Sequence, residues 1–414
     1  MARRILEALK TVVIAVLLLN ILFLSLLALP VSTVSRLSLP GFLAAALGVP
    51  EQPDVRDETG DGNNAAAKPV LLSICQEAGR SSIRRDPEAM EIAYERFGPF
   101  LRTGLTTADG GTAHTDDWSF LDAPGVLFFY DGSIPAQALC RWLEGQDCAV
   151  TDVCGGYALS CEADGVILYT IAGSQIRRYT TNVSHASLIA LLGEYTPDGA
   201  EFAYKRQDST AVPLTLWEPV VSVPDCATEN PVTAEFSRAM AAALDFNPYG
   251  SGTYTDPDGS TVYTESDRSL TVEPDGSVLL AVSGESYARF HAASASAADL
   301  IDTAGALLDV VFGTAPGEAE VYLCDFWQEG EVTRLSYRYH FAGMPIYPTC
   351  AEITFLGSRF ADLRCTLRTF EQRSTSSTLL PLPQAAAIAE PGKLLFPAYD
   401  LSAAGAVKAG WRAQ

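Results

Sequence analysis

The sequence is short of positive charge. It has 28 lysine and arginine residues against 50 aspartate and glutamate residues, which gives a formal net charge of −22 at pH 7. Binding to DNA or RNA depends on neutralising phosphates, and an acidic surface repels them. The composition therefore argues against nucleic acid as a partner.

The motifs of several common enzyme classes are also missing. The sequence has no H-E-x-x-H, G-x-S-x-G, S-x-x-K or C-x-x-C, and no glycine-rich phosphate loop follows an expected strand. Asp57–Asn63 resembles the start of a calcium loop, but Lys68 occupies the twelfth position, where the ion needs a bidentate glutamate. We therefore expect no catalytic residue, no cofactor and no metal site.

A long uncharged run near the N-terminus predicts a membrane anchor. Thr11–Leu29 contains one amide, Asn20, and no charge. As a helix rising about 1.5 Å per residue, it would cover most of the ~30 Å hydrocarbon core. Arg3, Arg4 and Lys10 precede it, and positive charge keeps that end in the cytoplasm. The alternative is a cleaved signal peptide, which has a shorter apolar region followed by small residues.

The anchor sets the expected organisation of a single-pass membrane protein whose bulk is extracytoplasmic. Residues 1–10 are cytoplasmic, 11–30 span the bilayer, and 31–68 form a juxtamembrane segment and stalk. Residues 69–230 form a first α+β domain, and 231–414 a second region of two modules. Asn20 is either a passenger in the span or a helix–helix contact, because amides in lipid seek hydrogen-bond partners.

Nine cysteines leave at least one thiol unpaired within the chain. An exported domain permits disulfides. Cys140 and Cys365 fall at apolar positions and are expected to be small buried hydrophobes. Cys148, Cys154 and Cys161 lie close enough in sequence for one bridge, and the connectivity stays open.

The helix and strand patterns predict an α+β fold of helices packed on antiparallel meander sheets. Asp86-Pro87 is typical of a helix start. Thr233–Leu244 is expected to be helical, and four short strands separated by Pro-Asp-Gly turns follow, up to Ser283. A helical stripe over 297–311 then precedes four more strands, ending with one expected over Phe360–Phe370. The order of one helix and four strands is thus used twice.

One strand pattern suggests a docking surface. The strand Val332–Phe341 places Arg334, Arg338 and His340 on one face, and the last of the four strands adds Arg364 and Arg368. If these strands are neighbours, they form a basic patch that an acidic partner recognises. The alternative is an ordinary solvated sheet whose charges are balanced by nearby acids.

Two segments resemble the YycH/YycI family. They are Phe246–Ala281, with its strands and Pro-Asp-Gly turns, and Tyr337–Pro348, where a glycine and a proline precede the next strand. The basic-then-apolar anchor and the aromatic segment around Tyr399 and Trp411 match the family in layout. The likeness is specific mainly over 235–370. It is closer to the YycH type, because an extra region precedes the shared part.

The resemblance implies a function without catalysis. Family members are extracytoplasmic regulators of a cell-envelope two-component system in Gram-positive bacteria. Their membrane helices associate with the sensor histidine kinase and with a companion YycI-type regulator, so the partners implied here are those two proteins and the lipid bilayer. One alternative is an anchored PepSY-like inhibitor or binding module for an exported protease. Another is an envelope hydrolase whose catalytic groups meet only in space.

Overall fold

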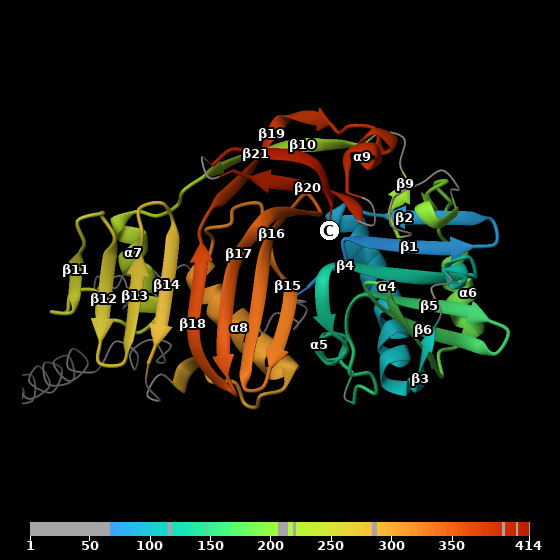
Figure 1. The fold of residues 1–414 in the computed structure, drawn as a ribbon, viewed down its shortest axis with the longest axis horizontal. Helices are drawn as coiled ribbons and strands as arrows, with labels where there is room; N and C mark the ends of the chain where they lie inside the picture. The colour runs from blue at the N-terminus through green and yellow to red at the C-terminus, as the bar shows by residue number, and fades with distance from the viewer. Residues whose placement is uncertain are drawn as a thin grey trace, which may run out of the picture. The chain divides into compact units, whose positions relative to one another are not determined.

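The computed structural model describes residues 67–114, 118–145, 147–205, 214–217, 221–283, 288–390, 394–402 and 405–413. They form six α-helices and a larger share of mostly antiparallel sheet (Figure 1), which confirms the α+β class. The expected span Thr11–Leu29, with Asn20, and the segment Asp57–Asn63 lie outside these residues. Within the described part of the chain, no helix combines the length and apolarity needed to cross a membrane.

The first sheet has seven strands, each antiparallel to its neighbours, in the order β2-β1-β4-β5-β6-β7-β3. They are β1 (Leu71–Gln76), β2 (Gly79–Ile83), β3 (Asp109–His114), β4 (Gly125–Pro135), β5 (Val153–Glu162), β6 (Gly165–Ala172) and β7 (Gln175–Thr180). Both faces of this sheet carry buried apolar side chains, so it packs as a central layer.

The helices of this region are α4 (Pro87–Thr107), α5 (Ala136–Trp142) and α6 (His185–Leu192). The N-terminus of α4 is capped as expected: the Ala89 amide donates to the Asp86 carboxylate at 3.0 Å, and proline follows the cap. The helix continues through Pro99 and buries Phe97 and Leu101 completely. The three acidic side chains of α4, Glu88, Glu91 and Glu95, are exposed to solvent.

The second sheet follows the path β11-β12-β13-β14-β18-β17-β16-β15. These strands are β11 (Thr253–Thr255), β12 (Thr261–Glu265), β13 (Arg268–Val272), β14 (Ser277–Val282), β15 (Glu320–Glu329), β16 (Val332–Phe341), β17 (Met344–Leu356) and β18 (Arg359–Thr366). All neighbours along this path are antiparallel. At the start of β17, β20 (Leu395–Leu401) pairs in parallel, and β21 (Val407–Ala413) pairs with β20.

The expected Pro-Asp-Gly turns are confirmed. Gly259 takes a positive φ of 91° and its amide donates to the Asp256 carbonyl at 2.9 Å, which reverses the chain between β11 and β12. Gly276 repeats the geometry between β13 and β14, with a φ of 97° and a bond to the Glu273 carbonyl at 3.1 Å. Only glycine adopts this region without steric cost, so the turn composition fixes where each hairpin closes.

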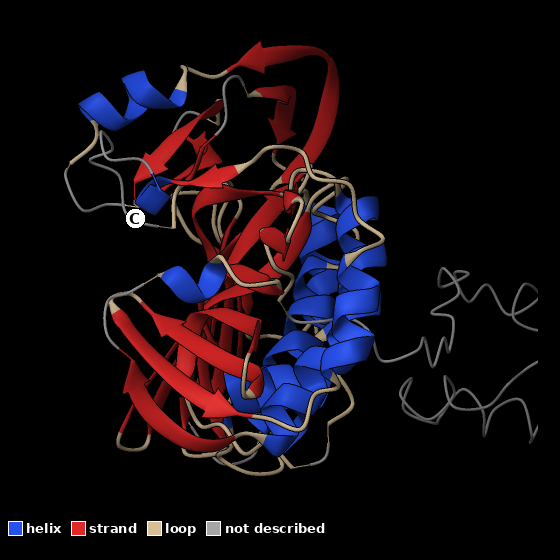
Figure 2. Cartoon of the chain, turned by 90° about the vertical axis from the view of Figure 1, so that its right-hand side faces the viewer, coloured by secondary structure: helices blue, strands red, loops and turns tan. Residues whose placement is uncertain are grey.

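The order of one helix and four strands occurs twice. α7 (Ala234–Ala243) precedes β11 to β14, and α8 (Ala297–Phe312) precedes β15 to β18. Both helices lie behind the second sheet in Figure 1, and Figure 2 shows the long helices gathered on one side of the strands. The fourth strands of the two sets pair antiparallel, with Leu280 opposite Leu363 and both fully buried. The last strands of the two sets thus join them into one sheet.

One expected boundary was wrong. The strand expected over Phe360–Phe370 is divided: β18 ends at Thr366, and β19 (Thr369–Thr378) leaves to pair with β10 (Ser222–Glu229). The chain leaves the sheet where the Leu367 amide bonds to the Gly276 carbonyl at 2.8 Å. The helix α5 starts at Ala136, because β4 pairs with β5 as far as Pro135.

The remaining elements are β8 (Glu201–Phe202), β9 (Leu216–Trp217), α9 (Leu382–Ile388) and three short 3-10 turns. All described residues belong to one compact unit, residues 63–414. The domain boundary expected at residue 231 falls two residues before Thr233, the cap of α7. That boundary stays a prediction.

Candidate functional site

The two sheets meet where three strands break their regular pairing. β4 shifts register against β5 between Phe129 and Ile134, and β16 shifts against β17 between Tyr337 and Tyr339. β15 shifts against β16 around Cys324. Such bulges turn a side chain away from its ladder and toward another surface. Here they aim Asp131 of β4 and Arg338 of β16 at each other.

The backbones approach closely at this junction. A side chain at Gly132 would place its Cβ 1.5 Å from the carbonyl oxygen of Cys324, so only glycine leaves room for β15 against β4. On a neighbouring side, Lys68 bridges the two regions. Its ammonium lies 3.8 Å from the Glu91 carboxylate on α4 and 3.7 Å from that of Glu320 on β15.

Asp131 and Arg338 form a buried ion pair. Both Asp131 Oδ2 and the Asp131 carbonyl accept hydrogen bonds from Arg338 Nη1, the carbonyl at 3.3 Å. Tyr347 donates its hydroxyl to Asp131 Oδ1 at 2.9 Å, and His340 Nε2 lies 3.6 Å from Oδ2. Burial alone would lower the pKa of Arg338, but the negative charge of Asp131 raises it overall. The guanidinium therefore stays charged.

Aromatic rings shield the ion pair of Asp131 and Arg338 from solvent. The Arg338 guanidinium lies 3.7 Å from the centre of the Tyr347 ring, and that of Arg412, from β21, lies 4.3 Å from the same centre. The Tyr322 ring meets His340 edge-on with centres 5.1 Å apart. Burial, with Asp131 nearby, raises the pKa of the Tyr347 hydroxyl well above its ordinary value, so it remains a donor. Cation–π contacts of this kind gain strength when water is excluded.

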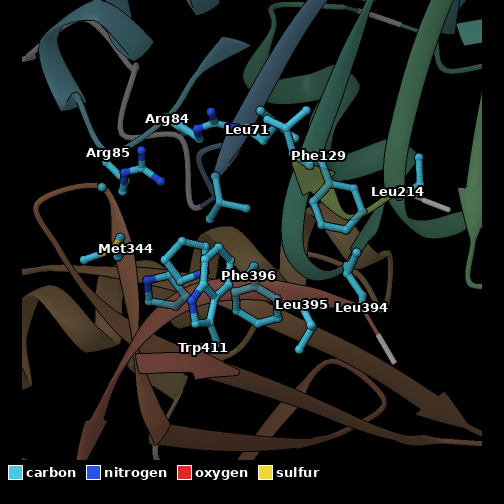
Figure 3. A pocket seen from close by; sticks show the side chains of 15 residues that line it. Leu71, Arg84, Arg85, Phe129, Leu214, Met344, Leu394, Leu395, Phe396 and Trp411 are labelled. Carbon is cyan, nitrogen blue, oxygen red and sulfur yellow. The ribbon is translucent and has the colours of Figure 1, made fainter. Parts of the chain in front are cut away.

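An apolar hollow of about 60 Å³ lies between the two sheets, with Phe129 of β4 and Phe396 of β20 in its wall (Figure 3). It is lined mainly by apolar side chains from both sheets, including Leu71, Phe129, Met344, Phe396 and Trp411. Arg84 and Arg85 stand at one side of it in Figure 3. Apolar walls with a few polar groups are typical of small-ligand pockets. This one suits a small apolar group next to positive charge.

The second sheet carries a wider and more open hollow of about 440 Å³. It lies over β14, β17 and β18, on the face opposite α8. Leu279, Glu352 and Arg364 are cross-strand neighbours there, and all three are exposed. This surface therefore presents both signs of charge next to an apolar side chain.

The five residues of the expected basic patch do not come together, and the predicted exposure of two of them was wrong. Arg338 and His340 are buried, because β4 of the first sheet covers that end of β16. β17 separates β16 from β18, so the strands are not neighbours.

The other three residues of the patch lie apart from one another. Arg334 is exposed with its guanidinium 5.2 Å from the centre of the Trp327 ring, and Arg364 is exposed 3.9 Å from Asp362. Arg368 donates hydrogen bonds to the carbonyls of Asp275 and Leu367, and these bonds stabilise the turn between β13 and β14. Of the five, Arg364 lies in the open hollow.

The four histidines differ in surroundings. His185 is exposed in the first turn of α6. His114 packs edge-on against the rings of Phe120 and Tyr169, and His291 is partly buried. His340 lies near the Asp131 carboxylate, which is paired with Arg338. Within the described residues, no three histidine, cysteine or acidic side chains gather as a metal site would need.

Sequence reasoning missed Asp131 and Tyr347. Asp131-Gly132 has the composition of a turn, so the sequence alone favours a strand end there. The signal present is a weak one, an acidic residue between two apolar stretches of one strand. Comparison with protein-family models, with curated proteins and with solved structures finds no match for this chain. The sites above therefore stand on geometry alone.

Proposed function

We propose that the chain is a non-enzymatic, membrane-anchored extracytoplasmic regulator of a cell-envelope sensor histidine kinase. The helix expected over Thr11–Leu29 packs against the membrane helices of the kinase. The folded unit outside the membrane binds a partner or an envelope cue, and this biases the packing. A companion regulator of the YycI type is the second expected partner.

The observation that carries the proposal is the repeated unit of one helix and four strands. The segment Phe246–Ala281, which resembles the YycH/YycI family, spans β11 to β13 and most of β14. Tyr337–Pro348 covers the end of β16 and the start of β17. Both segments form strands of the second sheet, and the open hollow around Arg364 offers a surface for contact with a partner protein. These features support a role in binding.

The buried junction supports a structural reading over a hydrolytic one. A hydrolase would pair a histidine with a carboxylate and a nucleophile, and His340, Asp131 and Cys324 lie in one region. Yet Asp131 is already bound by Arg338 and by the Tyr347 hydroxyl. Burial raises the pKa of Cys324 to about 12, whereas a nucleophilic cysteine needs a lowered pKa. We therefore interpret the ion pair of Asp131 and Arg338 as a structural contact between the two sheets.

The test is recovery of sensor kinases from membranes. The full chain is compared with a variant in which residues 11–30 are replaced by a polyleucine span, and with Asn20→Leu. Both variants keep the protein anchored, so only the sequence of the helix changes. We expect kinases to co-purify with the full chain and to fall to background with the polyleucine span. A partial loss with Asn20→Leu would assign a helix–helix contact to that amide.

Equal kinase recovery from all three proteins would remove contact through the helix. The folded unit, residues 63–414, is then tested alone for protection of an exported protease. Protection would favour the PepSY-like inhibitor over the kinase regulator. Arg364→Glu reverses charge in the open hollow and leaves the span unchanged, so loss of protection in this variant would assign the protease contact to the hollow.

A further inference from the structure

The apolar hollow between the two sheets carries charge of one sign. Among the fifteen described residues that line it, Arg84 and Arg85 are basic and none is acidic. The chain as a whole has 50 acidic residues against 28 basic ones, so a wall without acids runs contrary to the overall composition. The apolar hollow is therefore a positively charged site on an acidic protein.

Three aromatic rings border the apolar hollow without being fully packed. Phe129 of β4, Phe396 of β20 and Trp411 of β21 are each partly exposed, although they lie where the two sheets meet. Figure 3 shows Phe129 across the space from Phe396 and Trp411. Protein interiors leave few voids larger than a water molecule. The apolar hollow thus offers a ligand apolar surface that the chain itself does not cover.

The backbone fixes the position of the two arginines. They lie between the end of β2 and Asp86, the cap of α4. Arg85 takes a positive φ of 56°, and a Cβ at Gly343 would lie 2.9 Å from its Cα, so the turn between β16 and β17 packs directly on Arg85. A residue other than glycine adopts this conformation at a cost, and such residues are frequent at ligand sites.

The size and the charge of the apolar hollow define the class of ligand. An apolar cavity of about 150 Å³ holds benzene, so one of about 60 Å³ takes a chain of roughly two or three carbons. A multiply charged anion would place charge against apolar walls, which is costly. A guanidinium pairs well with a single carboxylate, because its planar fork matches the two oxygens.

We propose that the apolar hollow binds a short aliphatic carboxylate of the size of butanoate. The carbon chain lies between Phe129 on one side and Phe396 and Trp411 on the other. The carboxylate accepts hydrogen bonds from the Arg85 guanidinium, and Arg84 adds positive charge beside it. Since the walls come from both sheets, the ligand contacts both, and its binding stabilises their contact.

The experiment measures ligand binding to the full chain by saturation-transfer NMR. Butanoate is compared with butan-1-ol and butylamine, which have the same chain length and no negative charge. We expect butanoate to bind with a dissociation constant on the order of 1 mM, and about tenfold more tightly than butan-1-ol. Butylamine should not bind, because the arginines repel its ammonium group.

Two variants separate the charge of the site from its space. Arg85→Gln should weaken butanoate binding about tenfold and leave butan-1-ol binding unchanged, a selective loss that unfolding would not produce. Leu394→Trp enlarges a side chain of the wall and should abolish binding of both ligands. The matched control is Arg373→Gln on the exposed part of β19, which changes the net charge equally and should bind butanoate as the native chain does.

Three results would overturn the proposal. The first is an absence of saturation transfer to butanoate from the native chain, and the second is equal binding of butanoate and butan-1-ol. The third is an equal effect of Arg85→Gln and Arg373→Gln on butanoate binding. The Arg85→Gln comparison leaves the apolar walls intact, so it decides the question even where Leu394→Trp unfolds the chain. No arm needs a kinase, so the outcome is separate from that of the proposed regulatory function.

Discussion

At the scale of single residues, the carboxylate of Asp131 stabilises the contact between the two sheets. Asp131 is buried and neutralises Arg338, which is also buried. Asp131→Asn leaves the guanidinium without a counter-charge, and loss of one partner from a buried pair costs about 3–5 kcal/mol. We expect the free energy of unfolding to fall by that amount. Urea unfolding followed by circular dichroism measures it.

The matched control is an acidic residue in an exposed pair. Asp362 lies 3.9 Å from the Arg364 side chain, which is exposed to solvent. Exposed pairs contribute about 0–1 kcal/mol, so Asp362→Asn should leave stability nearly unchanged. Equal losses in the two variants would contradict the assignment of the junction to Asp131.

Whether the role of a single residue could be predicted from the sequence depended on how far along the chain its partner lies. The Asp86 cap was predictable, because its partner Ala89 is three residues away. The alternation of β16 correctly placed Arg338 and His340 on the face opposite Tyr337. Their burial was not predictable, since the covering residue Asp131 lies 207 residues before Arg338.

Close packing of β4 on β15 is the feature that matters at the element scale. A Cβ at Gly132 would overlap the Cys324 carbonyl, at 1.5 Å. Gly132→Ala must therefore push the strands apart and disturb the ion pair beside them. We expect a loss of at least about 2 kcal/mol, as for other overpacked or strained sites. Thermal unfolding of the variant checks this.

Gly305, within α8, is the control for this substitution. A Cβ there meets nothing within 4 Å, and its φ is not positive. Alanine is the better helix former by about 0.8–1.0 kcal/mol, so Gly305→Ala should raise the unfolding temperature. The two glycine-to-alanine changes should thus have opposite signs. A stabilised Gly132→Ala would show that the strands are not in tight contact.

Elements whose own sequence encodes them were predictable, and the others were not. The turns at Gly259 and Gly276 and the apolar stripe of α8 are local signals, and each element formed where expected. β3 (Asp109–His114) is polar and exposed, and it exists because β7 pairs with it. β19 is likewise mostly exposed and depends on β10. Pairing with a distant strand leaves no periodicity to detect.

Buried tyrosines make the stability of the whole molecule depend on pH. Burial raises the pKa of Tyr94 to about 12, and it raises those of Tyr130 and Tyr339 well above 10. Tyr94 and Tyr130 belong to the first region, and Tyr339 lies in the second sheet. A phenol that ionises more easily in the unfolded state favours unfolding at high pH. Both sheets carry such groups, so alkali acts on both.

The sign of the effect follows from the raised pKa. Below pH 10, Tyr94 is neutral in both states, and its contribution to stability is fully present. Between pH 10 and about 12, it ionises only in the unfolded state, and the contribution is lost at about 1.4 kcal/mol per pH unit. We therefore expect tyrosinate absorbance to rise together with loss of the circular dichroism of the sheets.

Tyr94→Phe removes one of these protons, so its stability should fall less steeply between pH 10 and 12 than that of the native chain. Tyr249, which is 81% exposed, supplies the control, because Tyr249→Phe should leave the slope unchanged. The measurement is the free energy of unfolding in urea at several pH values. If tyrosinate absorbance instead rises near pH 10 for most tyrosines while the circular dichroism is unchanged, the rings are accessible in the native protein. In that case, burial does not set its alkaline limit.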